Sequence, residues 1–360
     1  MNKVRGAPPI DKSKIHRILI RATNWVGDAV MSMPAFEAVR QNFPESHISV
    51  LARPWVAPLY ETHPAANQVI PYKRGYGYWK DFSEFLKVVR LIRSLHFDMA
   101  VLFQNAFEAA FIARLSGIKI RVGYNTDGRG FLLSHSVVRG KEVLKLHQVE
   151  YYLTVLRALG WNAPTKDPAL STGPEAIARV RSLLSSRGIE DQDLVVGLSP
   201  GAAYGPAKRW PVERFAAIGD RAIREWGAKV VVIGTEQEKA FGETLISATT
   251  PGAVNFCGMT GLGDALALIK RCRLFVSNDS GLMHVAAALK VPTVAVFGST
   301  DSVATGPRGK NARVVKQDME CSPCLKPECS AGYRCLLAVR PEDVWREMEK
   351  LREESSEQVA

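Results

Sequence analysis

Three segments that follow apolar runs carry residue types suited to group-transfer chemistry. The first places Asp28 after Asn-Trp-Val-Gly, at the start of a predicted helix. A carboxylate there can act as a general base toward a hydroxyl group, or it can serve only as the helix N-cap. The second segment, residues 199–211, contains Lys208, whose ammonium group can make a charge-assisted bond to a diphosphate. The alternative for that segment is a basic surface loop.

The third segment, residues 277–288, begins Ser-Asn-Asp-Ser-Gly and continues into an alanine-rich helix. The amides of Ser280 and Gly281, together with the positive end of the helix dipole, predict an anion site. His284 lies one turn further on, where it is either part of that site or a structural side chain. Glu236 follows another apolar run, and a carboxylate at a strand end can bind the hydroxyl groups of a ribose.

The glycine pattern argues against a dinucleotide cofactor. Residues 22–28 contain one glycine, Gly27, where a dinucleotide-binding loop has three. No Gly-x-x-x-x-Gly-Lys-Ser/Thr motif occurs either. An NAD-dependent dehydrogenase is therefore disfavoured.

Four of the six cysteines gather in one segment with the pattern Cys-x2-Cys-x4-Cys-x5-Cys. They are Cys321, Cys324, Cys329 and Cys335. Four thiols so close together, in a chain expected in the cytoplasm, suggest a structural zinc site with no catalytic role. The second half of the pattern is irregular, so redox-labile thiols and plain loop packing stay open as alternatives.

Strand-like apolar runs alternate with helix-period segments, which predicts an α/β fold with parallel sheets. The expected strands are residues 17–21, 47–51, 68–71, 98–103, 194–199, 229–234, 254–256, 274–277 and 293–297. The expected helices are residues 28–42, 82–95, 108–115, 148–159, 174–187, 212–225, 239–249, 263–271, 281–289 and 341–354. Each half of the chain forms one doubly wound sheet, and ligands of such sheets lie at the carboxyl ends of the strands. Two facing sheets would place a cleft between them.

A length of 360 residues fits two domains better than one. The segment at 161–173 is rich in proline, threonine and glycine and is the expected linker. We therefore expect domains at 1–165 and 166–345, followed by a C-terminal helix and tail at 346–360.

The net charge of +11 lies almost wholly in the first half. Residues 1–175 carry 23 Lys and Arg against 14 Asp and Glu, a net charge of +9. Such a surplus favours an anionic partner such as a membrane surface, although a solvated basic surface without a partner is the alternative. Basic and aromatic residues interleave at 72–80, which predicts weak contact with a bilayer or a phosphorylated sugar rather than with nucleic acid.

No stretch of 18 apolar residues exists, so no transmembrane helix is expected. Residues 1–16 are polar and lack the apolar core of a signal peptide, and we expect them to form a short disordered arm. These features predict a cytoplasmic protein.

Taken together and in order, the three loops resemble those of the ADP-heptose:lipopolysaccharide heptosyltransferases, family 9 of the glycosyltransferases. The resemblance covers residues 15–350. It is strongest to the heptosyltransferase II members in Asn-Trp-Val-Gly-Asp-Ala-Val-Met at 24–31, in the loop at 200–211 and in the cysteine-rich segment at 321–335.

The resemblance implies a GT-B fold, in which two Rossmann-like domains bind the acceptor and the ADP-sugar respectively. It implies transfer with inversion and with no cofactor required. Asp28 matches the family's catalytic base and Lys208 its diphosphate lysine. The donor-binding positions that match are Glu236, Met259, Asp279, Ser280, Gly281 and His284.

The sequence therefore predicts an inverting, metal-independent transferase. The expected donor is ADP-heptose carrying L-glycero-D-manno-heptose, and the expected acceptor is the lipopolysaccharide inner core, heptosyl-Kdo2-lipid A, at the inner face of the cytoplasmic membrane. Two alternatives stay open: another family 9 transferase with a different donor or acceptor, and a non-catalytic nucleotide-sugar-binding protein.

Overall fold

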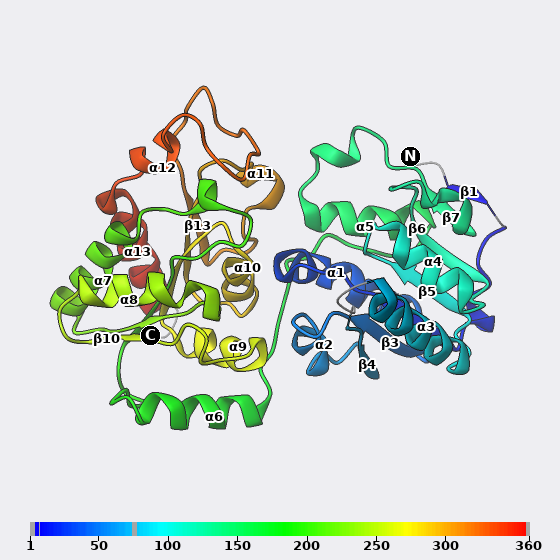
Figure 1. The fold of residues 1–360 in the computed structure, drawn as a ribbon, viewed down its shortest axis with the longest axis horizontal. Coiled ribbons are helices and arrows are strands. Elements are labelled where there is room, and N and C mark those ends of the chain that lie inside the picture. Colours follow the sequence, from blue (N-terminus) through cyan, green and yellow to red (C-terminus); the bar gives the residue numbers. More distant parts are fainter. Residues whose placement is uncertain (1–3, 7, 74–77, 358–360) are drawn as a thin grey trace. The chain divides into compact units, whose positions relative to one another are not determined.

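The computed structural model describes residues 4–6, 8–73 and 78–357 (Figure 1). The chain divides into two compact units, Met1–Pro168 and Ala169–Ala360, each built on one sheet. No regular element occurs between α5, which ends at Ala158, and α6, which begins at Pro174. The predicted linker lies in this interval.

The sheet of the first unit has seven strands in the order β1-β7-β6-β5-β2-β3-β4. Their bounds are β1 Val4–Gly6, β2 Arg17–Arg21, β3 His47–Ala52, β4 Gln68–Pro71, β5 Met99–Leu102, β6 Ile120–Tyr124 and β7 His135–Val137. All neighbours are parallel except β1, which pairs with β7 in the antiparallel sense. The expectation of a disordered arm at 1–16 is therefore wrong for Val4–Gly6, because backbone pairing to β7 fixes that segment.

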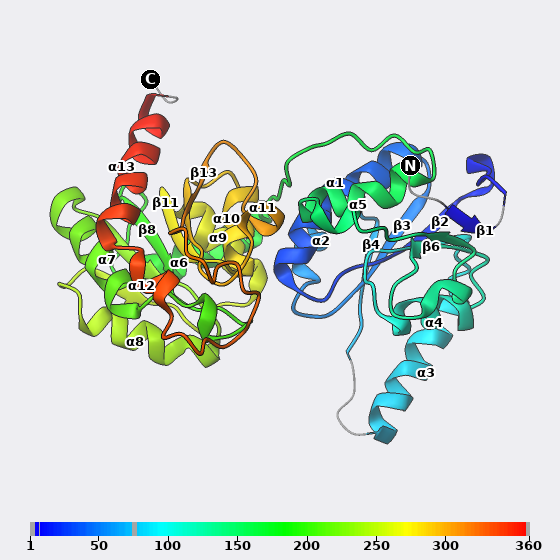
Figure 2. The ribbon, with the colours of Figure 1, turned by 90° about the horizontal axis from the view of Figure 1, so that it is seen from above.

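Helices cover both faces of this first sheet. Their bounds are α1 Val26–Asn42, α2 Pro58–Glu61, α3 Tyr78–Ser94, α4 Phe107–Leu115 and α5 Gln148–Ala158. Figure 2 shows α1 and α5 on one face and α3 and α4 on the other. Strands β6 and β7 were not among the predicted elements, since each is short and holds polar residues or glycine that hide its apolar pattern.

The sheet of the second unit has six parallel strands in the order β10-β9-β8-β11-β12-β13. Their bounds are β8 Val195–Ser199, β9 Lys229–Val232, β10 Ala253–Asn255, β11 Leu274–Asn278, β12 Thr293–Val296 and β13 Ala312–Val315. The helices are α6 Pro174–Ser185, α7 Val212–Trp226, α8 Lys239–Ser247, α9 Leu262–Arg271, α10 Gly281–Ala288, α11 Ser302–Thr305, α12 Arg334–Ala338 and α13 Pro341–Glu357.

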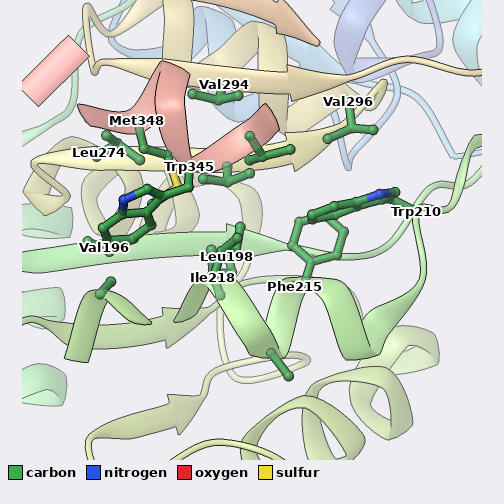
Figure 3. Packing of buried hydrophobic residues seen from close by; sticks show 14 of the residues in the cluster. Val196, Leu198, Trp210, Phe215, Ile218, Leu274, Val294, Val296, Trp345 and Met348 are labelled. Carbon is green, nitrogen blue, oxygen red and sulfur yellow. The ribbon is translucent and has the colours of Figure 1, made fainter. Parts of the chain in front are cut away.

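The closing helix α13 belongs to the core of the second unit. Trp345 and Met348 are buried against strand residues such as Val196 and Leu274 (Figure 3). Trp345 also packs on Trp226 of α7, with ring centroids 4.3 Å apart. The predicted separation of a C-terminal helix and tail at 346–360 is therefore wrong, because the apolar side of this helix completes the sheet's core.

In each sheet the strand order changes direction between two central neighbours. These are β2 and β5 in the first unit and β8 and β11 in the second. The loops after two such strands lead to opposite faces of the sheet, and ligands of parallel sheets commonly bind at their carboxyl ends. We call this position the crevice of each unit. No helix in the described part of the chain is long and apolar enough to cross a membrane.

Candidate functional site

In the first unit, Asp28 lies at the carboxyl edge of the sheet, where β2 leads into α1. The N-cap of α1 is Trp25, which makes no side-chain capping bond, and Asp28 is the third residue of the helix. Asp28 is half-buried. Burial raises the pKa of the Tyr152 hydroxyl well above its usual value, and the nearby Asp28 carboxylate raises it further. The N-cap alternative is therefore wrong, and the carboxylate is held at the crevice beside a buried phenol.

The loop before Asp28 is fixed by bonds to Asn24. Arg21 donates from Nη2 to the side-chain oxygen of Asn24 over 3.1 Å, and Trp55 donates from Nε1 to its carbonyl over 2.8 Å. Burial lowers the pKa of Arg21 to about 10. A fixed loop presents Asp28 in one position, which suits a general base.

Two polar side chains that the sequence reasoning missed flank this crevice. Thr23 follows β2 and Gln104 follows β5, and their exposed fractions are 5% and 9%. Thr23 Oγ1 and Gln104 Oε1 have no hydrogen-bond partner among the described residues. Buried polar atoms without partners are rare in proteins and call for a ligand or water. Their position directly after the two central strands was the available sequence signal.

In the second unit, Lys208 ends the short helix η4, Pro206–Lys208, in the loop after β8. Its Nζ lies 2.6 Å from Oδ2 of Asp279 and 4.9 Å from the ring centroid of Tyr204. The Tyr204 hydroxyl donates to the Leu325 carbonyl over 2.8 Å. These contacts hold the ammonium group at the crevice between β8 and β11.

Asp279 was predicted as a donor-binding residue, and the structure pairs it with protein groups. Its carboxylate accepts from the Thr300 hydroxyl as well as from Lys208, and its exposed fraction is 5%. An anion would be repelled by this carboxylate, so its visible role is to position Lys208. Direct contact of Asp279 with the donor stays a prediction.

Asn278, at the end of β11, was not singled out from the sequence. Its side chain connects the end of β11 with the loop after β8. Its side-chain oxygen accepts from the Trp210 amide over 2.9 Å, and its Nδ2 donates to the Pro200 carbonyl over 2.7 Å. Asn278 is fully buried. The loop carrying Lys208 is therefore fastened to the end of β11.

The N-terminus of α10 lies at the same crevice. Its N-cap is Ser280, whose hydroxyl bonds to that of Ser277 over 2.9 Å and does not cap the helix. Ser280 therefore does not bind the amides of the first turn, which begin with Gly281. These amides can donate hydrogen bonds to an external anion. His284 lies in the following turn with its side chain buried, and its role in the predicted anion site stays a prediction.

Glu236 and Met259 lie next to each other, although 23 residues separate them in the chain. Gly258 has φ +77°, and a Cβ atom added there would come within 1.9 Å of Glu236 Oε2. The Glu236 carboxylate therefore rests against the backbone beside Met259. The side chain of Glu236 is 67% exposed and Met259 is 43% exposed, so a ligand can reach both.

Strand order arranges these groups along one edge. Met259 follows β10, Glu236 follows β9, the Lys208 loop follows β8 and Ser280 follows β11. Adjacent strands are spaced by about 4.8 Å, so this edge spans roughly 14 Å. A nucleoside near β9 and β10 can therefore place its diphosphate between Lys208 and the amides of α10.

The cysteine-rich segment at 321–335 packs against the loop that carries Lys208. The Ala207 amide donates to the Pro327 carbonyl over 3.0 Å, and the Leu325 amide donates to the Ser299 carbonyl over 2.7 Å. Burial raises the pKa of the Cys335 thiol, and the neighbouring thiols Cys321, Cys329 and Cys324 raise it further. Among the described residues, no group of three or more His, Cys, Asp or Glu side chains is arranged to hold a metal ion. The structural zinc site stays a prediction, and elemental analysis of the purified protein is its test.

Comparison with known proteins agrees with this geometry. A model of glycosyltransferase family 9 (heptosyltransferase) matches residues 85–334. The lipopolysaccharide heptosyltransferase 2 of Salmonella typhimurium is 31% identical over 93% of this chain and 98% of its own length. The chain belongs to glycosyltransferase family 9. It is thus a glycosyltransferase, and the resemblance seen in the sequence is confirmed.

Two further family 9 members agree over nearly the whole chain. The lipooligosaccharide heptosyltransferase 2 of Haemophilus ducreyi is 32% identical over 93% of this chain and 99% of its own length. The solved structure of the Escherichia coli ADP-heptose lipopolysaccharide heptosyltransferase II superposes with a TM-score of 0.81 and 28% identity. That match covers 94% of this chain and 99% of the other. The predicted GT-B architecture of two parallel-sheet domains is thereby confirmed.

Proposed function

We propose that this glycosyltransferase moves L-glycero-D-manno-heptose from ADP-heptose to the first heptose of heptosyl-Kdo2-lipid A, with inversion and without a metal ion. The observation that carries the proposal is the row of groups along the edge of the second sheet, from Met259 to the amides of α10. The relatives named above are heptosyltransferases of the second type, and the name of the solved E. coli enzyme includes ADP-heptose.

In the proposed donor complex, Glu236 accepts hydrogen bonds from the ribose hydroxyls and Met259 contacts the adenine. Lys208 and the first amides of α10 bind the diphosphate. Positive groups aimed at the leaving diphosphate stabilise the charge that develops as the sugar departs. This is the part that a bound divalent cation plays in other transferases.

In the proposed reaction, an acceptor hydroxyl oxygen forms a bond to the anomeric carbon of the donor while the bond from that carbon to the diphosphate oxygen breaks. The hydroxyl proton passes to Asp28, and ADP leaves with the electron pair. A helix N-terminus favours the ionised form of a carboxyl group and so weakens it as a base. Asp28 therefore suits a proton transfer that occurs late, after the sugar has gained positive charge.

The test is ADP release from ADP-heptose in the presence and absence of monoheptosylated Kdo-lipid A, with a metal chelator present throughout. The proposal predicts release that depends on the acceptor and is unchanged by the chelator. Release only with a different sugar nucleotide or acceptor would favour another family 9 transferase. Donor binding with no transfer to any acceptor would favour a non-catalytic nucleotide-sugar-binding protein.

We also propose that the enzyme works at the inner face of the cytoplasmic membrane, because its acceptor is a lipid. Of the basic and aromatic segment at 72–80, residues 74–77 lie outside the described residues. Tyr72 is buried and donates to Glu108 Oε1 over 2.7 Å, so that side chain does not serve as a surface contact.

A further inference from the structure

A group of phenylalanine side chains forms an apolar patch on the first unit. Phe85 of α3 stacks on Phe111 of α4 with ring centroids 5.6 Å apart, and Phe107 of α4 lies 5.7 Å from Phe111. Phe131 of the short helix η2, Arg129–Leu132, lies 6.2 Å from Phe107. We call these four residues the phenylalanine patch. Three separate elements therefore contribute to one continuous apolar surface.

Much of this patch is open to solvent. The exposed fractions are 37% for Phe107, 36% for Phe111 and 78% for Phe131. Phe107 and Phe111 are four residues apart on α4, so they share one side of the helix, and Arg114 continues that side one turn later. The opposite side of α4 is buried. Contiguous exposed apolar surfaces are a feature of protein–protein and membrane interaction sites.

Basic side chains gather at the other end of α4. Arg93 donates to the Leu115 carbonyl, and Arg121 donates to the Lys119 carbonyl over 2.9 Å. Burial lowers the pKa of Arg121 most, and the charge of Arg114 lowers it further. The guanidinium groups of Arg114 and Arg121 are therefore close. We call Arg93, Arg114, Lys119 and Arg121 the basic cluster. Within the described part of the chain, no carboxylate forms an ion pair with any of the four.

The charge of the surrounding segment has the same sign. Residues 72–145 carry 13 Lys and Arg against 6 Asp and Glu, a net charge of +7. Most of the surplus of the first half therefore lies in the segment that carries the patch and the cluster. An apolar surface beside uncompensated cations matches the two components of an anionic bilayer, the acyl boundary and the headgroups.

The position of the patch relative to the acceptor crevice fits a lipid substrate. Helix α4 follows β5, η2 follows β6, and α1 with Asp28 follows β2. These strands are parallel neighbours, so Phe107, Phe131 and Asp28 all lie at the carboxyl edge of the same sheet. Figure 2 shows α4 and α3 on the face of that sheet away from α1.

We propose that the phenylalanine patch and the basic cluster form the surface by which this enzyme docks on an anionic phospholipid bilayer. The aromatic rings enter the acyl boundary, and the basic side chains contact the lipid phosphates. The docking proposal rests on the proposed function, in which the acceptor sugar is carried by a membrane lipid. An enzyme bound to the bilayer surface presents Asp28 to that sugar.

The test is co-sedimentation of the full chain with vesicles, without donor or acceptor. The vesicles are phosphatidylcholine alone or phosphatidylcholine mixed with phosphatidylglycerol. We expect the parent to bind the anionic vesicles only. The affinity for these vesicles should fall by about tenfold for Phe131→Ser. It should fall by roughly fivefold per charge removed for Arg114→Gln/Lys119→Gln. The matched controls are Ile177→Ser, at an apolar side chain 49% exposed in the second unit, and Lys290→Gln/Lys310→Gln, which should bind as the parent does.

Equal binding of the parent and the Phe131→Ser variant, or equal binding to both vesicle types, would overturn the proposal. A dimer of the parent that Phe131→Ser converts to a monomer, without any vesicle binding, would assign the patch to a second copy of the chain instead. Because Phe131 is 78% exposed, its replacement should leave folding intact.

Activity gives an independent readout. On a deacylated, water-soluble acceptor the Phe131→Ser variant should match the parent, whereas on a vesicle-embedded acceptor its rate should fall. Vesicle binding without any transferase activity would refute the proposed function alone. Transferase activity on vesicle-embedded acceptor that is equal in the parent and Phe131→Ser would refute the docking surface alone.

Discussion

The ammonium group of Lys208 lies 2.6 Å from the carboxylate of Asp279, and both side chains are largely buried. A lysine proposed to bind a diphosphate is therefore already paired with an acid of its own unit. Asp279 is also bound by the Thr300 hydroxyl, which fixes the carboxylate. The ion pair holds the Lys208 side chain in place before the donor arrives. The donor phosphates must then compete with Asp279 for the positive charge of Lys208.

Replacing the two members of this pair should have different effects. Lys208→Met removes the cation that meets the leaving diphosphate, so kcat should fall by about 10²–10³-fold. Asp279→Asn removes the charge that positions the lysine, and breaking a buried pair should lower the free energy of unfolding by about 3 kcal/mol. Steady-state kinetics and urea denaturation measure the two effects.

A matched control for Asp279→Asn is Asp318→Asn. Asp318 pairs with Lys316 at 3.6 Å on the surface, where its side chain is 98% exposed. Exposed pairs contribute about 0–1 kcal/mol, so this variant should be nearly as stable as the parent. If both Asn variants lose the same stability, the buried pair has no special role.

Asp28→Asn should remove the general base without altering the donor site in the other unit. We expect the transfer rate to fall by at least about 10²-fold, whereas the dissociation constant of ADP-heptose should stay near the parent value. Single-turnover kinetics and calorimetry check the two expectations. Turnover within about tenfold of the parent would show that the base is another residue.

Gly205→Ala should displace the loop that carries Lys208. Gly205 has φ +149°, and a Cβ atom there would lie 2.4 Å from the Pro327 carbonyl oxygen. Because that oxygen belongs to the backbone of the cysteine-rich segment, the loop itself must shift. The Michaelis constant for the donor should rise by about tenfold or more, consistent with loss of about 1.4 kcal/mol of binding.

The matched control for that loop is Gly188→Ala. Gly188 also has a left-handed backbone, with φ +70°, but an added Cβ would meet no atom within 4 Å. This variant should lose about 1 kcal/mol of stability and keep the parent's Michaelis constant. An equal rise in both variants would point to general strain rather than to the contact with Pro327.

Stability should fall in alkaline solution because of Cys272. Burial raises the pKa of its thiol from 9.0 to about 12. The unfolded chain then loses this proton first, so the stabilisation is complete below pH 9 and declines as the pH rises toward 12. At pH 10.5 the free energy of unfolding should be lower by roughly 2 kcal/mol than below pH 9. Urea denaturation at pH 7.5 and pH 10.5 should show a smaller decline for Cys272→Ala, and the exposed Cys321→Ala should decline as the parent does.

Much of the fold could be predicted because parallel strands and their helices leave periodic apolar patterns. The strands at Arg17–Arg21 and Gln68–Pro71 were placed at their observed bounds. What the sequence did not predict depends on partners far away in the chain. The strand β1 forms by pairing with β7, and the helix α13, although predicted as a helix, is held in the second unit by packing on distant strands. Such contacts leave no local pattern.

The sequence by itself determined the chemical groups and their order: an aspartate after the first strand, a lysine in a glycine- and proline-rich loop, and a glycine-led helix after Asn-Asp-Ser. Only the tertiary structure decided which groups face one another. It paired Lys208 with Asp279, set Glu236 beside Met259, and joined phenylalanines of three elements into one patch. The physical reason is that side-chain distances across strand ends depend on strand order and loop path, which are set by long-range packing.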